Sequence, residues 1–322
     1  MKLFPHIGTA AVLVLSVGGI LVLGAVDLAA ETFTLETARA AADKGDPQAE
    51  FFLARQYAHG LGVPRDYTQS VKFLRQAATQ GYAPAQTGLG SCFAHGEGVQ
   101  QDYVQAVQWY LKAANQDEPL AEFCMGQAYA HGFGAAKNMN AALAWWQKAA
   151  VKGQPDAENA LGQFNLNGEH PGDTNHINDA KAAQWFQKAA EHNYAPAMGA
   201  LGYMYLYGIG MGQDWTKALQ WNSRAADLND GIGQENLGQM YENGDAGLPH
   251  DLVQAYKWFW LSELQGNKFG EHDVIEIELH HALTPRQIDE AKRLANEFRA
   301  QLHSSRPAAA SGEITDSNEL SK

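Results

Sequence analysis

The stretch Ala85–Ala114, AQTGLGSCFAHGEGVQQDYVQAVQWYLKAA, decides the fold. Leu89 and Phe93 lie four residues apart, which places them on one face of an α-helix. A glycine-rich turn follows, and Asp102 then stands three residues before Gln105, the spacing of a capping box at the start of a second helix. The stretch therefore predicts one helical hairpin.

The same pattern recurs six times, with a period of 36 residues and one four-residue insertion. Small residues mark the start of each repeat: Ala49, Ala85, Ala121, Ala157, Ala197 and Gly233. Apolar, small and usually aromatic residues follow four, five and eight positions later, with Asn165 as the exception in the fourth repeat. The second helix of each repeat carries an aromatic residue at one shared position: Phe73, Trp109, Trp145, Trp185, Trp221 and Trp258. We interpret this position as the shared core of stacked hairpins.

The periodicity also predicts how the chain is divided. We expect six repeats at 49–84, 85–120, 121–156, 157–196, 197–232 and 233–267. A capping helix is expected within 31–48, closing helices within 268–303 and a disordered polar tail at 304–322. Thr284 and Pro285 are expected to begin the last helix. The predicted fold is all-α, a superhelical solenoid of stacked α/α hairpins.

Composition limits the function classes. Of the 322 residues, 45% are apolar and 18% are charged, so the chain has a core to bury. The net charge of -13 is the wrong sign for a surface that neutralises phosphates, which argues against general nucleic-acid binding.

The amino-terminal segment predicts export. An uncharged run extends over Ile7–Val26, with Lys2 before it and acidic residues after it. Two interpretations remain open: a signal peptide within residues 1–30, cleaved near Ala30, or an uncleaved membrane anchor at 7–26. Both place the repeats outside the cytoplasm, as a periplasmic or secreted protein.

The repeat resembles the Sel-one-like repeat proteins, which are relatives of the tetratricopeptide repeat. The second repeat nearly spells their pattern, A-x-x-x-L-G-x-x-Y-x-x-G-x-G-V-x-x-D-x-x-x-A-x-x-W-x-x-K-A-A. The fourth departs from it at Asn165 and in the loop that follows. The resemblance implies a non-enzymatic adaptor or scaffold that assembles other proteins, often at the bacterial envelope, and that needs no cofactor.

The resemblance also implies which residues meet a partner. In the tetratricopeptide-like arrangement, positions two, six, nine and ten after each repeat start line the concave side. The residues selected in this way are Phe51, Arg55, His59, Ser91, His95, Phe123, Gln127, His131, Gln163, Asn167, Tyr203, Tyr207, Gln239 and Asn243. Their aromatic and amide side chains suit an extended peptide or protein segment. A glycan or peptidoglycan ligand is the alternative, and an envelope hydrolase is disfavoured because no nucleophile stands with a base.

The remaining candidate residues for chemistry are histidines and cysteines. Three histidines recur in register before a loop glycine: His59, His95 and His131. Equivalent residues of stacked helices lie about 8 to 10 Å apart, too far to share one zinc ion, so we expect them to bond the turn. A second stripe, which we interpret as a solvated helix face, contains His272, Glu276 and His280. Cys92 and Cys124 are expected to be two thiols, with a disulfide as the open alternative.

Overall fold

The computed structural model describes residues 33–168, 177–280 and 282–305, which form helices and turns and contain no strand. The chain divides between Gln154 and Pro155 into two compact units. We call residues 33–154 unit 1 and residues 155–305 unit 2. The expected export segment and all but the start of the expected tail lie outside the described residues. Within them, no helix has both the length and the apolar character needed to cross a membrane.

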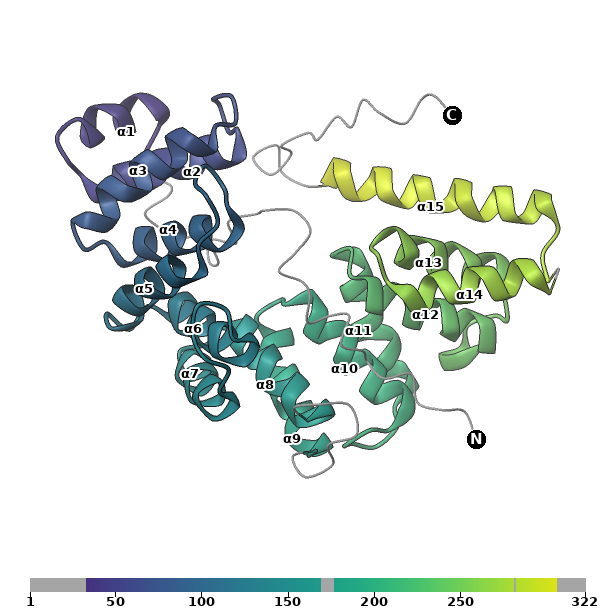
Figure 1. The fold of residues 1–322 in the computed structure, drawn as a ribbon. Coiled ribbons are helices and arrows are strands. Elements are labelled where there is room, and N and C mark those ends of the chain that lie inside the picture. Colours follow the sequence, from purple (N-terminus) through teal and green to yellow (C-terminus); the bar gives the residue numbers. More distant parts are fainter. Residues whose placement is uncertain (1–32, 169–176, 281, 306–322) are drawn as a thin grey trace. The chain divides into compact units, whose positions relative to one another are not determined.

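Unit 1 consists of seven helices, each packed against the next in the chain (Figure 1). Their bounds are α1 (Leu35–Ala42), α2 (Pro47–His59), α3 (Tyr67–Thr79), α4 (Ala83–His95), α5 (Tyr103–Ala114), α6 (Pro119–His131) and α7 (Met139–Val151). The first helix is the predicted cap, and the others form three hairpins. Thr34 caps α1 by accepting a hydrogen bond from the backbone of Thr37 (3.2 Å).

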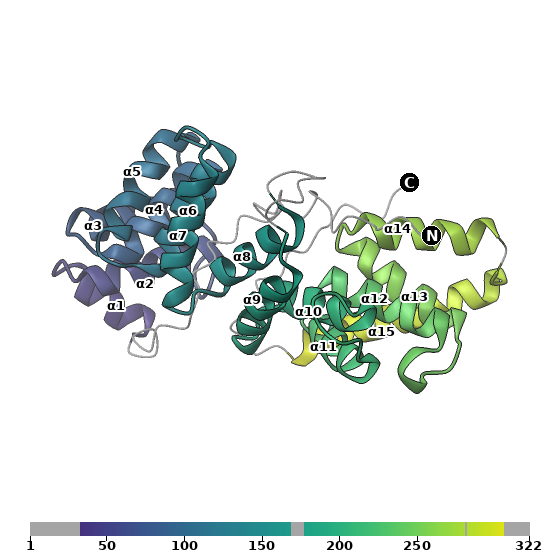
Figure 2. The ribbon, with the colours of Figure 1, turned by 90° about the horizontal axis from the view of Figure 1, so that it is seen from below.

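Unit 2 repeats the hairpin three times and then closes with two further helices (Figure 2). Its elements are α8 (Pro155–Asn167), α9 (Asp179–Glu191), α10 (Ala195–Tyr207), α11 (Trp215–Asp227), α12 (Gly231–Asn243), the short 3₁₀ helix η3 (Asp245–Gly247), α13 (Leu252–Leu264), α14 (Lys268–Leu279) and α15 (Pro285–Ser305). Besides packing on α11, helices α10 and α12 contact each other directly. The last helix runs two residues into the stretch expected to be a disordered tail.

Each hairpin is closed by one recurring backbone bond. The side chain of the residue that caps the second helix accepts a hydrogen bond from the backbone of that helix, as predicted. The backbone N–H of the same capping residue donates to the carbonyl oxygen of the residue eight positions after the repeat start. In the second repeat, the N–H of Asp102 donates to the carbonyl oxygen of Phe93 (2.8 Å). Gln105 therefore bonds the Asp102 carboxylate (2.9 Å) instead of that N–H, so the predicted capping box is only half formed.

The core differs from the prediction by one residue. In the second helix, the position that buries a large or polar side chain in every repeat is the one after the aromatic position named above: Leu74, Tyr110, Trp146, Phe186, Asn222 and Phe259. A small residue five positions after the repeat start makes room for it, so a Cβ at Gly90 would lie 2.7 Å from the Tyr110 ring. The expected close approach of the two helices is thus confirmed at this residue.

The tryptophans predicted as shared core lie mostly at the surface edge of that core. Trp109, Trp145, Trp185 and Trp221 are half-buried, and only Trp258 is buried. A cationic group lies over each ring, for example the Lys112 ammonium 3.8 Å from the centre of Trp109 and the Arg224 guanidinium 4.6 Å from the centre of Trp221. A cation three residues further along a helix stays solvated while it covers the ring, which explains why these rings need not be fully buried.

Two irregular regions are compensated locally. In the fourth repeat, buried Asn165 replaces the aromatic residue and donates its amide to the carbonyl of Leu161 (2.6 Å). At the carboxyl end, the Thr284 N–H donates to Gln287 (3.0 Å), and Phe298 of α15 packs edge-on against Trp258 (4.9 Å between ring centres). The predicted closing helix is therefore attached to the sixth repeat.

Candidate partner-binding surfaces

The predicted partner-binding residues all lie on the first helix of a repeat. We call the face formed by these positions the A-helix surface, with one such surface in each unit. Thirteen of the fourteen residues are exposed or half-buried. The exception is Phe51, which has 7% of its surface exposed and packs edge-on against Tyr82 (5.5 Å). Its prediction as an accessible contact is therefore wrong, because the core of the first repeat encloses the ring.

In unit 1 the A-helix surface holds aromatic, amide and histidine side chains. Burial, followed by the charge of Arg55, lowers the pKa of His59. His95, the last residue of α4, bonds the carbonyl of Ser91 within the same helix (2.9 Å) and not the loop turn that the histidine prediction named. His131 instead stacks on Phe133 (5.5 Å between ring centres). Phe123 and Gln127 are half-buried on α6.

In unit 2 the predicted residues of α10 and α12 come together. Tyr203 and Tyr207 have ring centres 4.6 Å apart, and the Tyr207 hydroxyl donates to Gln239 of α12 (2.5 Å). The two side chains can meet because α10 and α12 lie against each other. Asn236 of α12 also donates to the carbonyl of Gly199 in α10 (3.1 Å). The other predicted residues of unit 2 are half-buried Gln163 and Asn167 on α8 and exposed Asn243 at the end of α12.

Beside this face lie two carboxylates that the sequence analysis missed. Glu235 is 7% exposed and accepts bonds from Gln239 (2.8 Å) and Asn267 (3.1 Å). Burial raises its pKa to about 7, with a smaller contribution from the charge of Asp273. Burial likewise raises the pKa of Asp273 to about 6. Among the described residues, no lysine or arginine forms an ion pair with either carboxylate.

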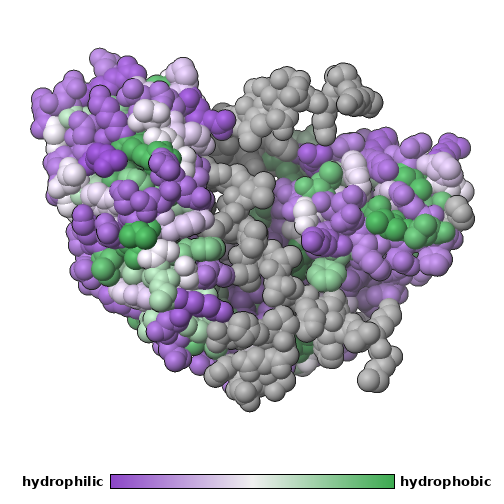
Figure 3. Space-filling model, viewed as in Figure 1, coloured by the Kyte–Doolittle hydropathy of each residue, from purple (hydrophilic) through white to green (hydrophobic). Residues whose placement is uncertain are grey.

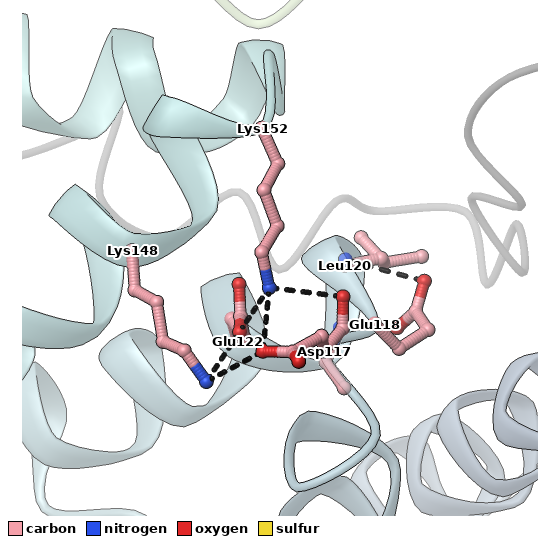
Figure 4. Close-up of polar contacts among 7 residues, drawn as sticks. Asp117, Glu118, Leu120, Glu122, Lys148 and Lys152 are labelled. Atoms are coloured by element: carbon pink, nitrogen blue, oxygen red, sulfur yellow. Dashed lines mark hydrogen bonds and ion pairs between the residues drawn. The ribbon is translucent and has the colours of Figure 1, made fainter.

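A buried carboxylate in unit 1 has the opposite environment (Figure 4). Glu122 of α6 has a fully buried side chain, and its Oε1 atom pairs with Lys148 (2.8 Å) and Lys152 (2.7 Å) of α7. Both lysines also reach Asp117, at 3.1 and 3.0 Å. Glu122 stands one position after the repeat start and Lys152 just after the second helix, so the pair ties the open ends of one hairpin together.

Polar pairs at these two positions recur in other repeats. Gln80 donates to Glu50 (2.8 Å), Gln116 donates to Gln86 (2.8 Å), and His192 bonds Glu158 (3.0 Å). Each pair joins residues 30 to 34 positions apart. The recurrence assigns these side chains to the hairpin itself and leaves the A-helix surface as the variable part of each repeat.

The remaining histidine and cysteine candidates can be described by their contacts. Within the ranges that the structure describes, no three His, Cys, Asp or Glu side chains are grouped closely enough to hold one metal ion. Glu276 bonds exposed His280 (3.1 Å) and lies 4.0 Å from exposed His272, as expected for a solvated stripe. Cys92 and Cys124 are thiols and form no disulfide.

The comparisons with known proteins agree with this architecture. The Sel1 repeat family model matches residues 47–82, 83–118, 119–153, 155–194, 195–230 and 231–267. A crystal structure of a protective antigen from uropathogenic Escherichia coli strains, described as displaying an SLR fold, is 32% identical over 82% of this chain, with a TM-score of 0.61. This chain spans only 56% of that antigen's length.

A Sel1 repeat protein from Oxalobacter formigenes is 28% identical, with a TM-score of 0.62, and the match covers 71% of this chain and 99% of that one. No curated protein matches the chain. Sel1 repeat proteins generally mediate protein–protein interactions and are typically non-enzymatic scaffolds. Six matched repeats and the observed hairpins lead to one conclusion: this chain belongs to the Sel1 repeat family.

Proposed function

We propose that this chain is an exported adaptor that binds an extended segment of a protein partner on its A-helix surfaces. The proposal is carried by one observation: some positions of each repeat are used for packing, and others leave their side chains accessible to a partner. The buried positions pack in the core and the end-to-end polar pairs bond each other. Positions two, six and ten of the first helices, in contrast, leave side chains such as Phe123, Tyr203 and Tyr207 half-buried or exposed.

The character of the surface favours a polypeptide partner with mixed contacts. In the view of Figure 3 the faces of both units are mostly hydrophilic, with apolar patches scattered between polar residues. Aromatic and arginine side chains contribute most of the binding energy at such interfaces, and neighbouring amides supply hydrogen bonds to a backbone. Export rests on the uncharged run at 7–26, so the partner is expected outside the cytoplasm.

A matched pair of aromatic residues tests the use of this surface. Tyr207 on α10 is 50% exposed, and Trp215 on α11, a second helix of a repeat, is 47% exposed. We expect Tyr207→Ala to weaken capture of the partner by roughly tenfold, the effect of losing about 1.4 kcal/mol at an aromatic contact. Trp215→Ala should leave capture unchanged. Partners would be cross-linked in envelope extracts and then measured with purified protein by calorimetry.

Two further measurements complete the test. If Trp215→Ala weakens binding and Tyr207→Ala does not, the partner uses the second helices and the proposal fails. Tight binding to purified cell-wall glycan, with no protein captured, would favour the glycan alternative. A reporter active only outside the cytoplasm, fused after residue 40, should be active if the repeats are exported.

A further inference from the structure

Unit 2 as a whole has an excess of negative charge. Residues 155–305 contain 21 acidic and ten basic residues, a net charge of -11, whereas residues 33–154 contain ten of each. The charge of the chain is therefore concentrated in unit 2. A surface of one sign attracts a partner segment of the other sign and speeds their association.

The excess is focused beside the tyrosine pair. Glu235, Asp245 and Asp273 all raise the pKa of Tyr207, after the larger effects of burial and of Tyr203, which places their charges near its hydroxyl. Glu242 and Glu276 act on Asp273 in the same way, so the acidic groups come from α12, η3 and α14. His272 is the group that contacts Asp273 (3.5 Å), and no lysine or arginine of the described chain pairs with Glu242 or Asp273.

Two tyrosine rings next to these carboxylates distinguish the A-helix surface of unit 2 from a simple cluster of acidic residues. The rings of Tyr203 and Tyr207 lie side by side, and Tyr207 is held by its bond to Gln239, which in turn donates to Glu235. Such fixed tyrosines bind well because little side-chain freedom is lost, and their faces attract an ammonium or guanidinium group. The rings of Trp109 and Trp221, on second helices of repeats, are in contrast already covered by the protein's own cations.

Buried charge in the two units supports the same conclusion. Glu122 in unit 1 is neutralised by two lysines, whereas Glu235 in unit 2 is almost equally buried and is bonded by two neutral amides. Unit 2 thus retains a carboxylate without a cationic partner beneath a surface that carries further carboxylates. A cation at that surface would be attracted by carboxylates with which no lysine or arginine of the described residues forms an ion pair.

We propose that the A-helix surface of unit 2 binds a lysine- or arginine-rich segment of a partner polypeptide, with Tyr203 and Tyr207 under its cationic side chains and Glu242 and Asp273 as countercharges. This inference rests on the proposed adaptor function and names the class of segment that the adaptor accepts. Unit 1, whose residues 33–154 carry no net charge, contributes little to this preference.

The probe is a fluorescein-labelled twelve-residue peptide with lysine at every third position among glycine and serine, compared with the same peptide carrying glutamate. With the full chain, we expect the lysine peptide to bind at least tenfold more tightly and to weaken as salt rises from about 50 to 300 mM. Glu242→Gln with Asp273→Asn should weaken it by roughly tenfold, the effect of losing two charge contacts of about 0.7 kcal/mol each, one exposed and one half-buried. Fluorescence anisotropy measures both.

The control removes the same charge elsewhere in unit 2. Glu191→Gln with Asp227→Asn, at the ends of α9 and α11, should change the affinity by less than about twofold. Equal binding of both peptides, or equal losses in the two double variants, would overturn the inference. If capture of the partner depends on Tyr207 but not on Glu242 and Asp273, the adaptor function stands and the cationic segment does not. If it depends on none of them, the adaptor function itself fails.

Discussion

Unit 1 and unit 2 are built from the same hairpin but differ in what they do with polar groups. In unit 1, Trp146 fills the space above Gly126, and the buried charge of Glu122 is neutralised by lysines of the next helix. In unit 2, Asn222 fills the equivalent space above Gly202, and Glu235 is bonded by amides alone. The residues that all repeats share therefore specify the hairpin. The residues that differ between repeats determine whether a buried carboxylate is paired with a cation or is bonded by neutral amides only.

The largest expected effect is at the shared core position. Trp146→Ala should reduce the free energy of unfolding of unit 1 by about 3 to 5 kcal/mol, because a large buried ring leaves a cavity. Asn222→Ala should cost unit 2 about 1 kcal/mol, through loss of its bond with Asn236 (3.0 Å). Hydrogen exchange followed by mass spectrometry resolves the two units.

Trp145→Ala is the control within α7, because its half-buried ring should cost clearly less than that of Trp146. Equal losses at the two adjacent tryptophans would show that the burial pattern of the second helix is misassigned. An equal loss at Asn222 would show that the amide position contributes as much as the aromatic one.

The next effect concerns the buried carboxylates. Replacing Lys148 and Lys152 by Met should destabilise unit 1 by about 2 kcal/mol, less than the full cost of orphaning a buried charge because the lysines are partly exposed. Adding Glu122→Gln should restore most of the loss. In unit 2, Glu235→Gln should be neutral or stabilising at pH 7.5, since no cation is orphaned. A destabilisation above about 2 kcal/mol by Glu235→Gln would contradict the comparison.

The third effect is an opposite pH dependence. Glu235 and Asp230 have pKa values raised to about 7 and Asp273 to about 6, in each case mainly by burial, so folded unit 2 holds more protons than its unfolded chain between about pH 4 and 7. The contribution of these three carboxyl groups to the stability of unit 2 should therefore be greatest near pH 4 and fall as pH rises to 7, by on the order of 2 kcal/mol.

In unit 1, burial lowers the pKa of His59 and His131, which favours their neutral forms in the folded state. These histidines make unit 1 gain stability as pH rises towards their ordinary pKa near 6.5. The raised pKa values of Glu50 and Glu97 act in the other direction, at lower pH. Hydrogen exchange at pH 5.5 and 7.5, corrected for intrinsic rates, measures both trends, and Glu235→Gln should flatten that of unit 2. Parallel trends would contradict this account.

The features that the sequence predicts correctly depend on contacts within one hairpin and on the period of the repeat. Asp102 as a helix cap and Gly90 as the point of close approach depend on neighbours within one hairpin. The burial of Tyr110 instead of Trp109 was missed, because two adjacent aromatic residues lie only about 100° apart around a helix and the apolar face is wide enough for either one. The lysine that covers Trp109 marks it as the outer residue of the two.

Side-chain contacts between residues far apart in the sequence were harder to predict. The pairing of Glu122 with Lys152 joins residues 30 positions apart, at the ends of helices where periodicity fixes no orientation. The acidic surface of unit 2 did leave a signal: His272, Glu276 and His280 follow Glu235, Gln239 and Asn243 by 37 residues each. That register places α14 as a further A helix, although its glycine pattern has faded. Phe51 was misjudged because Tyr82, 31 residues later at the end of the same repeat, covers it.

The smallest effect uses the cysteines, which both lie in unit 1, as reporters of that unit alone. Cys92 is fully buried and burial raises its pKa to about 12, whereas Cys124 is half-buried on α6. Since the thiolate is the reactive form, iodoacetamide should modify Cys124 first and Cys92 only when unit 1 opens. Mass spectrometry under native conditions should therefore show faster labelling of Cys92 in Trp146→Ala and an unchanged rate in Asn222→Ala. A faster rate in both variants would mean that the two units unfold together. Unit 1 and unit 2 would then differ in the charge of their surfaces but not in their stability.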